Sequence, residues 1–123
     1  MSATILLVDG KKFGELIGEA IDSLPPQFAQ KLNNVAVVVQ DSPADDQLRE
    51  LGLSKEDLLF GLYQGIPQTK RGHYSGVLPD KITIFKKAIE AVAKTEDEVK
   101  EKIRDTVMHE IGHHFGLSDE DLK

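Results

Sequence analysis

The sequence of 123 residues contains no cysteine and no tryptophan. Without thiols, neither a disulfide nor a thiolate metal ligand can form, so any metal must be bound through nitrogen and oxygen. No apolar run approaches the roughly 20 residues that a membrane-spanning helix needs. Residues 5–8, an apolar run near the start, are also too few for a signal peptide. We therefore expect a cytoplasmic protein with no membrane partner.

Positive charge is scarce as well. Fifteen lysines and arginines stand against 21 aspartates and glutamates, which gives a formal net charge of −6 and a pI near 5.1. Nucleic-acid binding requires a clustered basic face, and the short pairs Lys70-Arg71 and Lys86-Lys87 do not make one. Nucleic acid is therefore not expected as a partner. Hydrophobic residues at 40% and charged residues at 29% are typical of globular proteins, so we expect one domain spanning residues 1–123.

The hydrophobic pattern predicts helices and strands that do not alternate regularly, which favours an α+β fold. Residues 1–12 are expected to be a loosely attached leader or a short strand. The expected helices cover residues 13–24, one or two turns within 28–32, a turn at 48–51, residues 88–93 and residues 95–115.

Three segments have the composition of strands. Residues 35–39 are rich in valine, which predicts a central strand buried on both faces. Residues 58–63 favour a second strand that ends at Gly65, although a helix also fits these residues. Residues 81–86 alternate in polarity and carry a lysine at each end, which predicts a half-buried strand at a sheet edge.

The final helix has the clearest local signals. Thr95 and Glu98 make a capping-box pattern that predicts its start. His109 and His113 fall about 140° from the centre of its apolar stripe, so they face a cleft or solvent. The stripe expected to be buried consists of Val99, Ile103, Val107, Ile111 and Phe115.

These two histidines are spaced to bind one metal ion. Residues at i and i+4 of a helix share a face about 6 Å apart along the axis, so both imidazoles can reach one tetrahedral zinc ion. Glu110 lies beside them and is suited to activate a zinc-bound water. Gly116 favours a left-handed reversal after the helix, which would bring Asp119 back as a third ligand. An idle, solvated helix face is the alternative interpretation.

With the residues from His109 to Asp119 in view, the chain resembles the zincin-like metallopeptidases, and within them a small bacterial single-domain group described as minimal zincins. Residues 35–39, 61–67 and 76–85 are also similar to recurring segments of that group. The resemblance covers the chain from Phe13 onward. It implies a small α+β domain, in which a short mixed or antiparallel sheet packs on a C-terminal active-site helix and an N-terminal helix.

The resemblance also implies how a substrate would bind. The strand nearest the active-site helix, expected at residues 82–85, would pair with an extended peptide or an unfolded protein segment. Larger relatives place a third histidine where this chain has Asp119, and they continue into a methionine-containing turn. Only four residues follow Asp119 here. We therefore expect a cleft that is shallow, open or completed by another chain.

Other polar residues near the motif have weaker cases. His114 points about 100° away from the preceding histidine around the helix, so we expect it beside the ligands or at the surface. His73 and Tyr74 lie in the loop before the third strand, where a donor could contact a substrate oxyanion; packing on the sheet rim is the simpler interpretation. Asp105, one turn before His109, could orient that imidazole, but a solvated charge is the simpler interpretation.

The leading prediction is a zinc-dependent metallopeptidase. His109, His113 and Asp119 would bind Zn²⁺, and Glu110 would act as general base and then as proton donor. A second hypothesis is a module that binds zinc and peptide at the same site without cleaving the peptide. A third is an acidic interaction subunit without metal.

Overall fold

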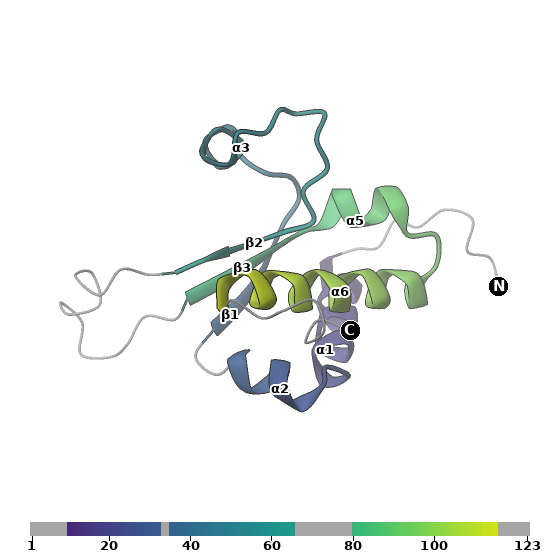
Figure 1. Cartoon of the computed structure of the whole chain (residues 1–123). Coiled ribbons are helices and arrows are strands. Elements are labelled where there is room, and N and C mark those ends of the chain that lie inside the picture. The colour runs from purple at the N-terminus through teal and green to yellow at the C-terminus, as the bar shows by residue number, and fades with distance from the viewer. Residues whose placement is uncertain (1–9, 33–34, 66–79, 116–123) are drawn as a thin grey trace.

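The computed structural model describes residues 10–32, 35–65 and 80–115. In these ranges α1, α2 and α6 lie to one side of a mixed sheet and α3 lies to the other (Figure 1). This arrangement confirms the predicted α+β class with an N-terminal and a C-terminal helix. The elements are α1 (Gly10–Asp22), α2 (Pro26–Ala29), η1 (Gln30–Leu32), β1 (Val35–Gln40), α3 (Asp45–Leu51), β2 (Gly61–Gln64), β3 (Asp80–Phe85), α5 (Lys86–Val92) and α6 (Glu96–Phe115).

The described strands have the order β1-β3-β2, so the last of these three along the chain lies in the middle. Strand β3 pairs in parallel with β1 along its whole length and antiparallel with β2. The prediction that residues 81–86 form an edge strand was therefore wrong. The four uncharged residues of β3 are all buried, and three of them are paired with both neighbouring strands, while Lys86 already belongs to α5. Lys81 and Lys86 flank the buried residues of this strand, but their charge does not show whether the strand is central or at an edge.

Strand β1 was also misplaced by the prediction. It lies at an edge of the sheet instead of the centre, and Val38 and Val39 are 37% and 43% exposed. Val35 and Val37 do pack against the core. Valine-rich composition predicts a strand, but it does not show how many neighbours the strand will have.

The amino-terminal helix α1 begins earlier than predicted. Residues 10–12 form its first turn, while residues 1–9 lie outside the described residues. The helix buries Phe13, Leu16, Ile17 and Ala20, as its spacing predicts. Pro26 begins α2, where a missing backbone N–H costs nothing.

The long helix α6 starts with the predicted cap. The Glu98 amide donates to Thr95 Oγ1 over 3.0 Å, and the Glu98 carboxylate accepts from the Lys94 amide. The first four residues of the predicted stripe are fully buried, but Phe115 is 41% exposed. A step of four residues drifts by about 40° around a helix, so a stripe built on it leaves the buried side after several turns.

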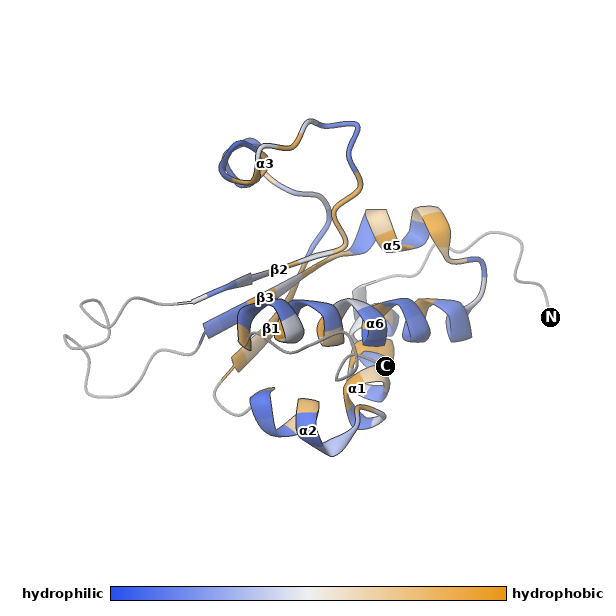
Figure 2. Ribbon diagram, in the orientation of Figure 1, coloured by the Kyte–Doolittle hydropathy of each residue, from blue (hydrophilic) through white to orange (hydrophobic). Residues whose placement is uncertain are grey.

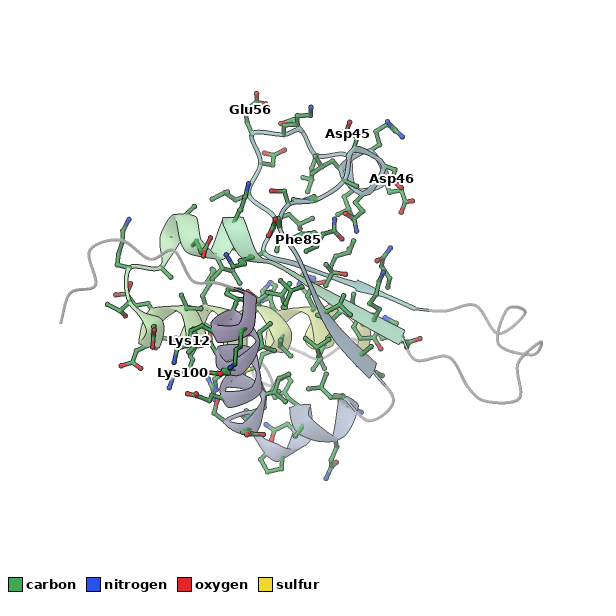
Figure 3. All side chains as sticks on the ribbon, turned by 180° about the vertical axis from the view of Figure 1, so that it is seen from behind. Lys12, Asp45, Asp46, Glu56, Phe85 and Lys100 are labelled. Carbon is green, nitrogen blue, oxygen red and sulfur yellow. The ribbon has the colours of Figure 1, made fainter. Side chains whose placement is uncertain are left out.

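The buried side of α6 packs against α1 and the sheet. Its outward side is largely hydrophilic (Figure 2). Lys12 and Lys100 lie where α1 meets α6 (Figure 3), and Lys100 Nζ is 3.1 Å from the Glu19 carboxylate. This ion pair is exposed and adds little, so apolar contact supplies most of the stability. No helix in the described ranges has the length and apolar character needed to cross a bilayer.

Helix α6 also approaches β2 very closely at Gly61. A Cβ atom built on Gly61 would lie 2.5 Å from Thr106 Cγ2 and 3.2 Å from the carbonyl oxygen of Thr83. No side chain fits between these two elements. Glycine at position 61 therefore sets the distance between the helix and the edge strand.

We expect Gly61→Ala to lower the free energy of unfolding by about 1–3 kcal/mol, because the added methyl group must push β2 and α6 apart. Chemical denaturation of the purified variant measures this. Thr106→Ser removes the opposing methyl group and can keep the hydroxyl bond to the Lys102 carbonyl, so the double variant should recover part of the loss.

Gly14→Ala is the matched control, because nothing lies within 4 Å of a Cβ atom at that helical position. It should leave stability unchanged or raise it by up to about 1 kcal/mol. Equal effects of the two glycine substitutions would contradict the close contact at Gly61.

Candidate metal centre

His109 and His113 project from one face of α6. Their ring centroids are 4.4 Å apart and the ring planes are inclined by 52°. Both side chains are exposed, since this face of the helix turns away from the core. One helical turn between the two residues is sufficient to produce this pairing. The structure therefore brings two of the three predicted metal ligands together.

The donor set of this pair fits zinc. Imidazole nitrogen is a preferred zinc ligand, and two of them on one helical turn can occupy adjacent positions of a tetrahedral ion. The described part of the chain contains no group of three or more metal-ligating side chains. Asp119, the third predicted ligand, lies outside the described residues, as do Gly116, His73 and Tyr74.

Glu110 points from α6 toward β2. Its Oε1 accepts a hydrogen bond from the Tyr63 backbone N–H over 2.9 Å. The carboxyl is half-buried, and this burial raises the pKa of Glu110 above its ordinary value. The Tyr63 amide and the two neighbouring histidines oppose the rise only in part. A carboxyl with a raised pKa keeps its proton to a higher pH than an exposed glutamate does, which suits it to proton transfer.

Tyr63, in β2, contacts the C-terminal end of α6. Its ring stacks on His114 with centroids 3.9 Å apart and planes inclined by 17°, and its hydroxyl donates to Asp80 Oδ2 over 2.8 Å. His114 therefore lies on the same side of the helix as Glu110, one turn further on. Tyr63 did not stand out in the sequence, because nothing local distinguishes it from any aromatic residue in a strand.

A hollow of about 300 Å³ opens beside the two site residues His109 and Glu110. It continues along α6 past Asp105, which is exposed and forms no hydrogen bond with His109 among the described residues. A larger hollow of about 460 Å³ lies between the α3 segment and α5 and includes none of the predicted site residues. The smaller hollow is thus the one that adjoins the candidate centre.

Two exposed histidines one turn apart, with a half-buried glutamate beside them on a helix that packs against an edge strand, are features of a metal-dependent hydrolase. A family model described as zincin-like metallopeptidase matches residues 32–123. The chain belongs to this family, which confirms the resemblance found in the sequence and implies a metal cofactor, typically zinc. No curated protein matches the chain. The narrower resemblance to minimal zincins stays a prediction.

The raised pKa of Glu110 has a consequence for stability. A folded-state pKa above the unfolded value means that the folded protein binds this proton more tightly, so stability falls as pH rises through the raised pKa. We expect metal-free Glu110→Gln to be more stable than the parent at pH 7. The difference should vanish below about pH 4, where unfolded glutamate is also protonated. Denaturant titrations in EDTA at both pH values measure it.

Glu101→Gln is the control, because it removes the same charge from an exposed position of α6. It should not reproduce the gain at pH 7. A parent protein that is more stable than Glu110→Gln at pH 7 would show that the bond from the Tyr63 amide outweighs the burial of the charge.

Proposed function

We propose that the protein is a zinc-dependent peptidase, with His109, His113 and Asp119 as the zinc ligands and Glu110 as the general base. The observation that carries this proposal is the position of Glu110. Glu110 directly follows His109, one member of a histidine pair that fits zinc. Its carboxyl has a raised pKa and accepts a hydrogen bond from the backbone of β2. Family membership supports the peptidase activity.

When bound, zinc would supply Lewis-acid chemistry, which polarises a peptide carbonyl and makes water acidic enough to attack it near neutral pH. The chain supplies the proton transfers. Glu110 accepts a proton from the attacking water and delivers it to the nitrogen of the leaving amine. Its buried position favours the protonated form that the second transfer needs.

The resemblance led us to expect that a peptide would pair with residues 82–85. The structure leaves no room for that pairing. Strand β3 is paired on both sides, so it has no free edge. We propose the outer edge of β2 instead. The Tyr63 N–H donates to the Glu110 carboxylate, so this carboxylate lies beside the backbone of β2. A peptide that pairs there would place its backbone beside the Glu110 carboxyl.

A second candidate function is the capture of peptide without cleavage. The exposure of both histidines favours it. A site open to solvent excludes water poorly, and electrostatic interactions with a transition state are weaker there. The two functions differ in what Glu110 does, so the same substitutions test both.

We expect one zinc ion per chain after incubation with micromolar zinc and removal of the excess. His109→Ala should abolish binding, since the remaining ligands do not close a tetrahedral site. Asp119→Ala should weaken it. His114→Ala is the matched control on the same helical turn and should keep the metal. Elemental analysis measures the stoichiometry, and retention of zinc by His109→Ala would overturn the ligand assignment.

The zinc-loaded Glu110→Gln variant should keep the metal and lose peptide cleavage by about 10²–10⁴-fold, the usual loss when a general base is removed. Mass spectrometry of unstructured peptide mixtures measures the cleavage, and Glu101→Gln should cleave like the parent. Peptide binding without cleavage in both the parent and Glu110→Gln would support the capture module instead.

A further inference from the structure

The hollow beside the candidate metal centre is lined by apolar residues on one side and by a lysine at one end. It begins at His109 and Glu110 and runs toward the start of α6, between the helix and the residues that precede β2. Leu59 and Phe60 form an apolar wall, and Lys102 lies at the far end. Its volume of about 300 Å³ suits a single amino-acid side chain better than a whole peptide.

Lys102 is the only cationic side chain among the described residues that line this hollow. Its ammonium nitrogen lies 3.9 Å from the centroid of the Phe60 ring. No carboxylate of the described residues forms an ion pair with Lys102, and the carboxylate of Glu98, one turn earlier, is bonded to the Lys94 amide. Contact with an aromatic face leaves the N–H donors of a lysine available to a ligand.

The distance from the metal centre is also suitable. Lys102 and His109 are seven residues apart, which is about 10.5 Å along the helix axis. One extended peptide residue spans about 3.5 Å, and standard bond lengths place a glutamate carboxylate roughly 4–5 Å from its Cα atom. One peptide residue and a glutamate side chain together span most of the separation between His109 and Lys102. The remaining distance from the carboxylate to the Lys102 ammonium is within contact range.

We propose that this hollow, the Lys102 pocket, binds the side chain next to the scissile peptide bond and selects an acidic side chain, with glutamate preferred. The proposal rests on the peptidase or peptide-capture function proposed above. An apolar side chain would bury the ammonium without a partner, and a basic one would meet a like charge. The methylene groups of glutamate would contact the apolar wall. Asp105 is exposed at the rim, where solvent screens its repulsion.

The test uses hydroxamate-capped dipeptides that differ only in the side chain next to the hydroxamate, which is glutamate, glutamine, leucine or lysine. Calorimetry on zinc-loaded protein measures their Kd values. The glutamate compound should bind about 3- to 10-fold more tightly than the glutamine compound, as expected of a partly exposed ion pair. Lys102→Arg should keep this order, Lys102→Gln should abolish the difference, and Lys102→Glu should favour lysine.

Lys11→Glu, an exposed change on α1, controls for net charge and should keep the order of the parent. The same side-chain order in the parent and in Lys102→Glu would overturn the proposal, as would no preference for glutamate in the parent.

Uncapped peptides titrated into metal-free, ¹⁵N-labelled protein keep this test independent of zinc. Glutamate peptides should shift the Phe60 and Lys102 amides more than glutamine peptides do, and the absence of that difference counts against the pocket. Failure to bind zinc would overturn only the metal assignment.

Discussion

The close contact between α6 and the edge strand β2 is the constraint on which the candidate site depends. Gly61 allows the helix to approach until Thr106 lies against the strand backbone. One turn along the helix, that proximity lets the Glu110 carboxyl reach the Tyr63 amide over 2.9 Å. The same proximity half-buries the carboxyl, and this burial raises its pKa although the bond from Tyr63 opposes the rise. A wider gap would leave Glu110 in solvent, where it would be an ordinary surface acid.

Two sides of the same helix then have different chemistry. The side facing β2 carries Glu110 and His114, which contact Tyr63 through its backbone and its ring. The side facing the open hollow carries His109 and, two turns earlier, Lys102. Because neighbouring residues diverge by about 100°, a helix can present a proton acceptor to the strand and metal ligands to solvent within a few positions. The proposed reaction takes place where these two sides meet.

The topology of the sheet limits where the proposed peptide could pair with a strand. Among the described strands β3 lies in the centre and the edges belong to β1 and β2, of which β2 contacts Glu110. The acidic net charge of −6 gives the protein no general attraction for acidic peptides. The proposed preference for an acidic side chain would therefore come from a local cation, and Lys102 is the lysine that lines the hollow.

The sequence by itself determined the elements and the pairing of His109 with His113, because both depend on helical periodicity and caps within a few residues. It also determined the family through that motif. It could not determine the order of the strands, since pairing joins segments far apart in the chain, and residues 35–39 and 81–86 were placed wrongly for this reason. The contact from Glu110 to Tyr63 spans 47 positions, so only the tertiary structure decided it. Burial of that carboxyl, and hence its raised pKa, follows from packing and not from any local pattern.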